Sequence, residues 1–287
     1  MVARSSNYCT EGGRPRTQMA QASAVERRQK LSTPDQVIRK LEPGTSIFIG
    51  TGAAEPRLLV KELMKSSFEG LQDLELIQLV SLGEALSPAE IRERKFRLKT
   101  FYSGGLASEA ITEGRVDLIP RRFSQIPVLF TSGQLQVEAA FVQITPPDKA
   151  GYCSLGVAVD VARQVMEKAR LKVGEINSEI PRTYGDTFVH VSDFDHLVES
   201  SEEPIYISRW PIYQAFDAVA ANVASVIEDG SCIAFSFGPL FEALVPHLAQ
   251  KRHLGVHSPF ITDALMDLIE SGAVSNNHKA VVRGKSL

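Results

Sequence analysis

Short apolar runs alternate with segments of helical period from Leu31 onwards. The runs at 46–50, 74–80 and 137–144 are dominated by apolar residues, which is typical of strands buried on both faces. Between the first two, residues 57–66 place leucines on one face of a helix. This alternation predicts an α/β fold in which helices cover both faces of a sheet.

A helix start is visible before the first strand. Thr33 is suited to cap the helix, Pro34 stands at its first position, and Gln36 completes a capping box. The pattern predicts that this helix ends at Pro43-Gly44. Further strands are expected at 96–102, 155–159 and 171–176, and further helices at 108–113, 161–168 and 215–227.

An internal repeat is the strongest single feature of the pattern. Residues 42–52 (EPGTSIFIGTG) recur at 228–238 (EDGSCIAFSFG) without a gap. Each copy lies between two predicted helices, and the next apolar run, 73–77, is answered by 253–257. Coincidence is the alternative, because Pro-Gly or Asp-Gly before a strand is common. A duplication predicts helix, turn, strand, Gly-loop, helix and strand, twice.

The patterns predict three regions. Residues 1–30 are rich in Ser, Gly, Gln and Arg and have no period, so we expect disorder there; a transit peptide, or a true start at Met19, are alternatives. Residues 31–210 predict a complete α/β domain. Residues 217–287 predict the incomplete start of a second, similar α/β domain.

Composition narrows the class of protein. A net charge of -3 gives no basic footprint for nucleic acid, and no apolar run is long enough to span a membrane. Three widely spaced cysteines argue against a disulfide framework, so we expect a cytoplasmic protein. The six histidines fall singly, and we expect no metal site.

The loop 50–56 (GTGAAEP) is a candidate ligand site between a strand and a helix. Gly50 and Gly52 would let a ligand approach the backbone, and the helix N-terminus would favour an anion. A simple packing turn is the alternative, since the full dinucleotide fingerprint is absent. The second copy keeps Gly238. Cys153 has no base placed beside it by sequence, which favours a small buried residue over a nucleophile.

Four stretches together resemble the acetyl-CoA hydrolase/transferase family of the class I CoA-transferases. They are 44–56 (GTSIFIGTGAAEP), 145–156 (TPPDKAGYCSLG), 177–186 (NSEIPRTYGD) and 254–263 (LGVHSPFITD). The resemblance implies two similar α/β domains with the active site between them. It also implies a coenzyme A thioester and a small carboxylate as substrates, no bound cofactor, and a role in acetyl-CoA and acetate metabolism. The implied CoA or acyl contacts lie at Gly50, Gly52, Gly238 and Ser258.

The family mechanism that the resemblance implies begins with a glutamate carboxylate, which attacks the acyl-CoA thioester and becomes a glutamyl-CoA thioester. The expected position of that glutamate is Pro259 here, which has no carboxylate, so we assign no catalytic residue. We therefore expect a CoA-transferase or acetyl-CoA hydrolase that is impaired alone, with its second domain cut short.

Two other interpretations stay open. The chain could be the non-catalytic half of a split enzyme completed by a companion chain, or an inactive gene fragment; a homo-oligomer is a further possibility. A sugar-phosphate isomerase or regulator of related architecture would use a similar Gly-loop, but the Pro-Pro-Asp and Pro-Arg-Thr stretches do not support it.

Overall fold

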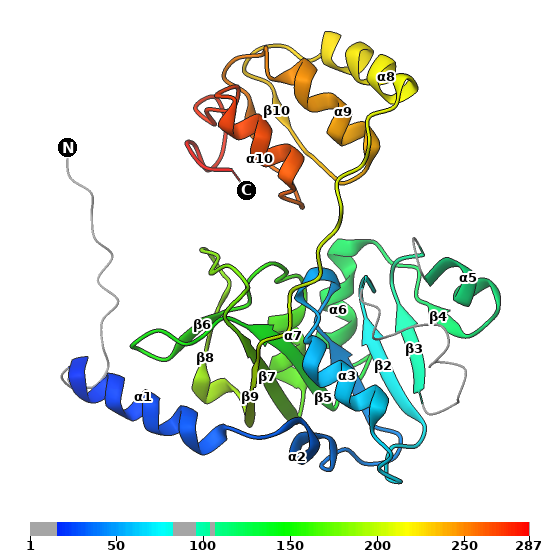
Figure 1. Cartoon of the computed structure of the whole chain (residues 1–287), viewed down its shortest axis with the longest axis vertical. Helices are drawn as coiled ribbons and strands as arrows, with labels where there is room; N and C mark the ends of the chain where they lie inside the picture. Colours follow the sequence, from blue (N-terminus) through cyan, green and yellow to red (C-terminus); the bar gives the residue numbers. More distant parts are fainter. Residues whose placement is uncertain (1–15, 83–95, 104–106, 287) are drawn as a thin grey trace. The chain divides into compact units, whose positions relative to one another are not determined.

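The computed structural model describes residues 16–82, 96–103 and 107–286 (Figure 1). The chain divides between residues 206 and 207 into two compact units. Each unit is described by itself below. In the described ranges, no helix has the length and apolar character needed to cross a membrane.

The first unit is built on a seven-stranded sheet in the order β4-β3-β2-β1-β5-β7-β9, in which all neighbouring strands are parallel. The strands are β1 (Ser46–Ile49), β2 (Leu74–Gln78), β3 (Phe96–Thr100), β4 (Val116–Leu118), β5 (Ala139–Ile144), β7 (Leu171–Asn177) and β9 (His196–Ser200). A separate antiparallel pair joins β6 (Tyr152–Ser154) to β8 (Phe188–His190).

Helices cover both faces of the large sheet, as the alternating pattern predicted. One apolar core lies between the sheet and the helices α2 (Pro34–Ile38), α3 (Arg57–Lys65) and α5 (Ala107–Thr112). The other lies under α6 (Ile126–Thr131) and α7 (Ala162–Lys168). Strand β1 contributes side chains to both cores, because alternate side chains point to opposite faces of the sheet. The predicted α/β architecture is confirmed.

The predicted capping box opens α2. The backbone N–H of Gln36 donates to Thr33 Oγ1 at 3.3 Å, and the Thr33 N–H donates to Gln36 Oε1 at 2.9 Å. The helix itself is shorter than expected and ends at Ile38, well before Pro43. Residues 39 and 40 form a turn instead, since the N–H of Lys40 bonds back only three residues, to Val37.

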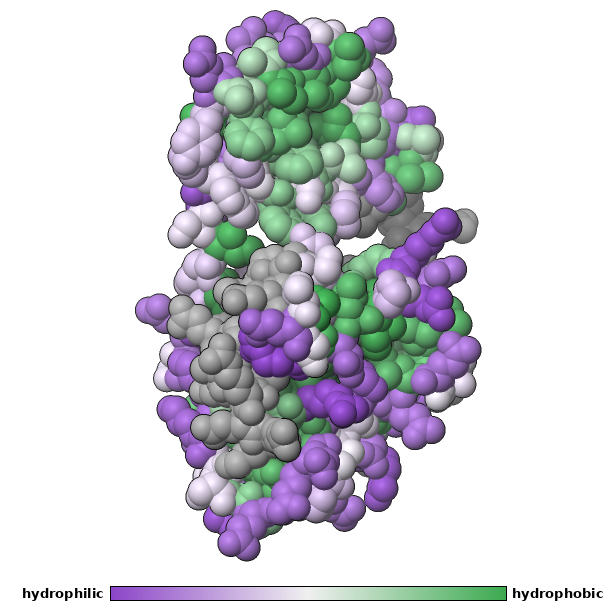
Figure 2. Space-filling model, turned by 90° about the vertical axis from the view of Figure 1, so that its right-hand side faces the viewer, coloured by the Kyte–Doolittle hydropathy of each residue, from purple (hydrophilic) through white to green (hydrophobic). Residues whose placement is uncertain are grey.

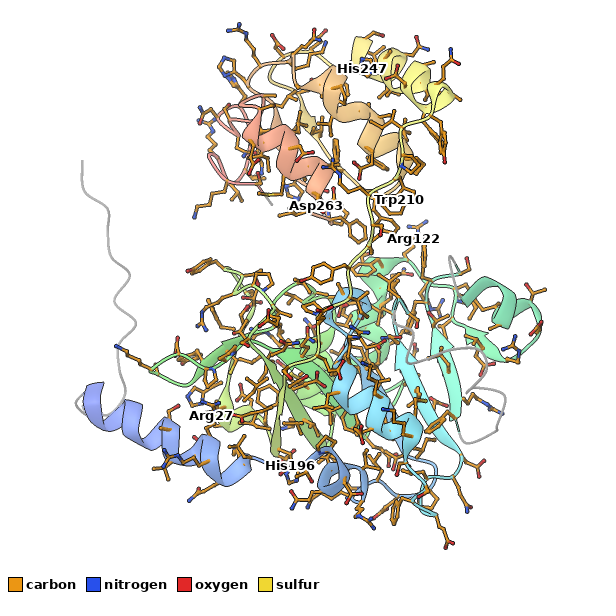
Figure 3. The ribbon with its side chains drawn as sticks, viewed as in Figure 1. Arg27, Arg122, His196, Trp210, His247 and Asp263 are labelled. Carbon is orange, nitrogen blue, oxygen red and sulfur yellow. The ribbon has the colours of Figure 1, made fainter. Side chains whose placement is uncertain are left out.

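The second unit holds a two-stranded parallel sheet, β10 (Cys232–Ile233) and β11 (Gly255–Val256). Its helices are α8 (Gln214–Ser225), α9 (Pro239–Leu248) and α10 (Asp263–Glu270). Their apolar faces form one core. At the surface, His247 of α9 bonds to Asp217 of α8 at 2.8 Å (Figure 3).

The repeat expected from the sequence recurs in backbone geometry. Gly44 and Gly230 occupy the same place in the two copies, with left-handed φ angles of 79° and 80°. Each donates its N–H across to the segment before the next strand, Gly44 to Gln72 and Gly230 to Arg252, both at 2.9 Å. The following strand begins with matching bonds, from Glu75 N–H to Thr45 O and from Gly255 N–H to Ser231 O. The second unit therefore repeats the turn and the first strand-pairing bonds that precede β1 and β2 in the first unit.

The N-terminal region differs from its prediction over residues 16–30. The structure has helix α1 (Arg16–Lys30) in place of a disordered segment, while residues 1–15 lie outside the described residues. Polar contacts hold the end of this helix: Arg27 pairs with Glu199 at 2.6 Å, and Lys30 Nζ donates to Val191 O at 3.1 Å. The periodicity of the sequence could not reveal these contacts, because their partners lie 172 and 161 residues further along the chain.

The strand expected at 155–159 is also wrong. The extended segment comes earlier, as β6, and pairs antiparallel with β8. Gly156 then takes a left-handed φ of 68°, which ends the extended chain. An apolar run of five residues was therefore too short a signal to place this strand.

Candidate functional site

The large sheet has a topological switch point at β1. From β1 the chain winds outwards through β2, β3 and β4, and then returns to place β5 on the other side of β1. In open α/β sheets, ligands bind beyond the carboxyl ends of the strands at such a point. The loops that follow β1 and β5, residues 50–56 and 145–151, flank it. These are two of the stretches that carried the family resemblance.

The loop 50–56 is tightly folded around its glycines. Gly50 donates its N–H to Phe141 O at 2.9 Å, and Gly52 donates to Val80 O at 2.8 Å. A Cβ on Gly50 would lie 2.5 Å from the backbone oxygen of Ala54, so only glycine fits there. Gly52 has a φ of 55°, in the left-handed region that favours glycine.

These contacts change what the glycines contribute. The sequence suggested that their backbone N–H groups are donors for a ligand, but both are used inside the unit. Most of the loop is buried, and only Thr51 and Ala53 are partly exposed. Gly50 and Gly52 therefore shape the loop, and their role in binding CoA stays a prediction.

The N-terminus of α3 is occupied by the protein's own carboxylate. Glu175, a fully buried residue of β7, accepts the N–H of Leu58 at 3.3 Å and that of Leu59 at 2.9 Å. Pro56 precedes the helix and offers no side-chain cap. The acceptor expected from an anionic ligand at this helix end is thus supplied by a side chain of β7. Burial raises the pKa of Glu175 to about 7, against the opposing effect of these N–H bonds.

A second buried carboxyl group lies in the loop itself. Glu55 is fully buried, and its Oε2 accepts from Gln78 Nε2 at 3.0 Å. The same nitrogen donates to Gly50 O at 3.0 Å, and Gln143 Nε2 donates to the backbone oxygen of Glu55 at 3.3 Å. Burial raises the pKa of Glu55. Glu55 stands just before α3 but does not cap it, since Glu175 takes that role.

Sequence reasoning missed Gln78, Gln143 and Glu175. All three are fully or almost fully buried, near the carboxyl ends of three apolar strands, and Gln143 stands opposite Glu175 in the register of β5 and β7. One signal was available. A polar residue near the end of an otherwise apolar parallel strand is buried by its neighbours, so it needs a polar partner.

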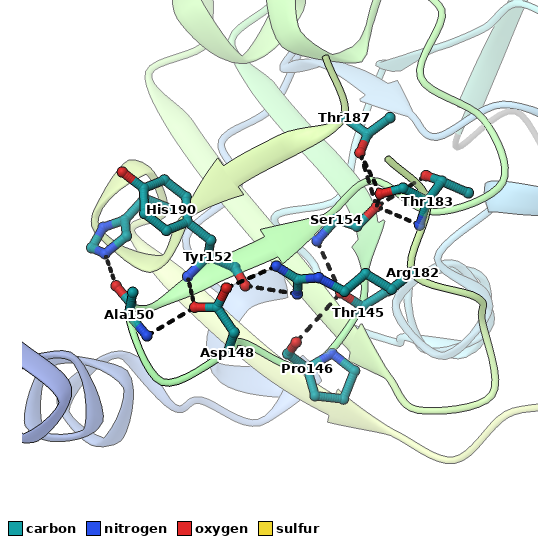
Figure 4. A network of polar contacts seen from close by, with 10 residues as sticks. All are labelled: Thr145, Pro146, Asp148, Ala150, Tyr152, Ser154, Arg182, Thr183, Thr187 and His190. Carbon is teal, nitrogen blue, oxygen red and sulfur yellow. Dashed lines mark hydrogen bonds and ion pairs between the residues drawn. The ribbon is translucent and has the colours of Figure 1, made fainter. Parts of the chain in front are cut away.

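The loop after β5 is bonded to the residues that follow β7 (Figure 4). Asp148 accepts the backbone N–H of Ala150 at 2.8 Å and of Tyr152 at 3.0 Å through Oδ1. Its Oδ2 pairs with Arg182 Nη2 at 2.9 Å, and Arg182 Nη1 donates to Tyr152 O at 3.0 Å. The Pro-Pro-Asp and Pro-Arg-Thr stretches thus form one polar network.

Ser154 is the centre of the same network. Its buried Oγ accepts the N–H of Gly156 at 3.1 Å and of Thr183 at 3.2 Å, and lies 3.2 Å from Thr187 Oγ1 (Figure 4). The neighbouring Cys153 is fully buried, and burial raises its pKa to about 12. It is therefore a buried, packed residue, as predicted, and the raised pKa disfavours the thiolate form that a nucleophile needs.

In the second unit, Gly238 and Ser258 lie after the two short strands. Gly238, with a φ of 126°, precedes α9. Ser258 Oγ accepts the N–H of Phe235 at 2.9 Å and lies 2.8 Å from Phe260 O, so it is used in shaping the turn. Pro259 follows it at an exposed position.

Aromatic contacts and an ion pair lie near this turn. The ring of Phe237 packs edge-on against that of Phe260, with 5.4 Å between the ring centroids. It also stacks on the ring of Trp210, with 6.2 Å between the centroids; Trp210 is labelled in Figure 3. Glu242, in the first turn of α9, pairs with Arg209 at 2.8 Å. Within the ranges described above, no group of three or more His, Cys, Asp or Glu side chains is placed to hold a metal ion.

Known proteins are similar to this chain in both sequence and fold. Residues 16–208 match the model of the acetyl-CoA hydrolase/transferase N-terminal domain. The chain is 34% identical over 258 residues to 4-hydroxybutyrate coenzyme A transferase of Clostridium kluyveri, covering 90% of this chain and 60% of that protein. It is 33% identical to a succinyl-CoA:acetate/propanoyl-CoA:succinate CoA transferase of Fasciola hepatica, covering 88% of this chain and 53% of the relative.

Solved structures agree with these relatives. RipA from Yersinia pestis has a TM-score of 0.84 at 25% identity, over 92% of this chain and 63% of that one. The 4-hydroxybutyrate CoA-transferase of Porphyromonas gingivalis has a TM-score of 0.74 at 25% identity, over 90% and 61% of the two chains. This chain thus spans between 53% and 63% of the length of these proteins. The resemblance found in the four sequence stretches is confirmed: the chain belongs to the acetyl-CoA hydrolase/transferase family.

Proposed function

We propose that this chain binds an acyl-CoA at the switch point of the first unit and takes part in CoA transfer to a small carboxylate, or in acyl-CoA hydrolysis. The observation that carries this is the placing of two family stretches, 50–56 and 145–156, beside the carboxyl ends of β1 and β5. The relatives named above are CoA-transferases, which supports the same substrate class. We place the reaction in cytoplasmic acetyl-CoA and acetate metabolism; a tagged chain found in another compartment would contradict that location.

Within that function, we propose that no covalent CoA adduct forms at position 259. The resemblance puts the nucleophilic glutamate there, and a proline has no oxygen nucleophile in its side chain. Ser258 beside it is bonded to Phe235 and Phe260, which favours a shaping role. The chain alone would then bind acyl-CoA with little turnover.

The test combines turnover with trapping. The purified chain is incubated with acetyl-CoA and acetate, treated with borohydride or hydroxylamine, and digested for mass spectrometry. We expect little hydrolysis or exchange, and no adduct on the peptide that contains Pro259. Robust turnover with an adduct on any glutamate would show that the nucleophile lies elsewhere.

Two variants sharpen this assay. Pro259→Glu restores a carboxylate, and Pro259→Ala is its matched control without one. We expect Pro259→Glu alone to gain little activity, because attack also needs orientation and oxyanion donors. Turnover is expected when Pro259→Glu is joined to the C-terminal portion of a relative, while the alanine control stays inactive in both backgrounds.

A second candidate, a non-catalytic subunit that works with another polypeptide, is supported by the surface of the second unit. Helix α8 exposes Phe216 by 37%, Val219 by 48% and, just beyond its end, Val226 by 78%. Figure 2 shows apolar side chains gathered on the face of this unit that is turned to the viewer. Contiguous exposed apolar surface marks interaction sites in soluble proteins.

The two candidates differ in what the partner is. A companion chain carrying the rest of a second domain would restore turnover when co-expressed, and a homo-oligomer would show as a concentration-dependent mass in sedimentation. Replacing Val219 and Val226 by Glu should weaken either association, with Val25→Glu on α1 as an exposed apolar control. A monomer that neither partner nor variant changes would contradict this candidate.

A further inference from the structure

Three buried oxygen atoms under the loop 50–56 have no hydrogen-bond partner among the described residues. They are Glu55 Oε1, Gln78 Oε1 and Gln143 Oε1. Both glutamines donate to Glu55 through their nitrogen atoms, Gln78 to the carboxyl oxygen Oε2 and Gln143 to the backbone oxygen. All three residues are at most 1% exposed. Each atom is an acceptor without a donor, which costs about 1–3 kcal/mol per group.

The surroundings do not supply a positive charge for Glu55. Arg57 is the basic residue that acts on it, but Arg57 Nη1 donates to the backbone oxygen of Glu203 at 2.6 Å. The titratable groups nearby are acids: Glu175, bound to the start of α3, lies opposite Gln143 in the sheet, and Asp160 reaches the loop at Thr51. An ionised Glu55 would therefore be a buried carboxylate without an ion pair, which is strongly unfavourable.

A single proton resolves this arrangement. A protonated Oε1 is a donor, and donation to the carbonyl oxygen of either Gln78 or Gln143 would satisfy two of the three unpartnered atoms at once. We propose that Glu55 is a positioning residue that acts as a neutral carboxylic acid, joining the loop 50–56 to the glutamines of β2 and β5. Burial raises the pKa of Glu55, which agrees with this state.

The proposal fixes what each substitution does. Glutamine copies a neutral acid: its oxygen accepts from Gln78 as Oε2 does now, and its NH₂ donates to an unpartnered carbonyl. Methionine has a similar length but no donor and only a weak sulfur acceptor, so it leaves the amide groups without strong partners. Glu62→Gln on α3 is the matched control. It is the same substitution, made at a side chain that is 44% exposed.

The protonation state is measured directly on the full chain by carbon-13 NMR of labelled glutamate. The Glu55 carboxyl resonance is identified as the one missing from Glu55→Gln. We expect it to keep the carboxylic-acid position at neutral pH, where ordinary glutamates are ionised. A carboxylate position at neutral pH overturns the proposal, whatever the variants do.

The positioning role is measured by hydrogen exchange at the N–H groups of Gly50 and Gly52. We expect exchange in Glu55→Gln and Glu62→Gln to stay within about threefold of the unmodified chain, and Glu55→Met to exchange at least about tenfold faster. Equal protection in Glu55→Met, or loss of it in Glu55→Gln, would refute the role. Both measurements read the loop itself, so they stand apart from whether it binds acyl-CoA.

Discussion

Replacing Glu175 by glutamine tests the link between burial and pH in the first unit. The folded chain holds this carboxyl at a pKa of about 7, against an ordinary value of 4.5. Between these values the folded state binds more protons than the unfolded chain, so stability falls as pH rises through this window. The loss approaches about 3 kcal/mol above pH 7, since each pH unit of difference is worth about 1.4 kcal/mol.

Glutamine removes the titration but keeps one acceptor for the N–H groups of α3. We expect Glu175→Gln to be slightly less stable than the unmodified chain near the acid end of the window, because one N–H of Leu58 or Leu59 loses its partner. The order should reverse above pH 7, where the unmodified chain carries the cost of a buried charge.

The assay is urea unfolding followed by circular dichroism at several pH values between about 5 and 8. The quantity to compare is the difference in unfolding free energy between the two proteins, because other titrating groups cancel in it. Glu167→Gln on the exposed face of α7 is the control for the loss of one glutamate carboxyl group. A flat difference for Glu175→Gln would refute the reasoning, since Glu175 would then titrate equally in both states.

Two further predictions follow from local geometry. Cys153, with a pKa raised to about 12, should resist iodoacetamide in the folded chain while the exposed Cys232 reacts, as peptide mass spectrometry would show; labelling of both at equal rates would contradict the burial of Cys153. Gly50→Ala should destabilise the first unit by about 1–3 kcal/mol in urea unfolding, because its Cβ meets Ala54 O; an unchanged midpoint would show that the loop yields freely.

Features that depend on neighbouring residues could be predicted from the sequence. The capping box at Thr33 needs only a residue three positions away, and the repeated Gly44 and Gly230 turns are short enough to leave a matching pattern. The buried strands were recognisable because parallel strands covered on both faces are apolar throughout.

The candidate site was predictable only in outline. Its two loops could be named from their residues, but the partners of those loops could not, because they come from other strands. Glu55 shows the difference: beside a glycine loop and a helix it resembles a capping residue, yet its contacts are with Gln78 of β2 and Gln143 of β5. Helix α1 was missed for the same reason, since Glu199, which holds Arg27, lies far along the chain.

The cap on α3 also has a consequence for the order of folding. Glu175 lies 116 residues after Leu59, so the helix cannot obtain its cap until β7 has joined the sheet. Contacts between such distant residues close large loops and tend to form late. Glu175→Gln should therefore change the unfolding rate and leave the folding rate nearly constant, a low φ-value that stopped-flow kinetics would reveal. The start of α3, where the loop 50–56 ends, is then among the last parts of the first unit to become ordered during folding.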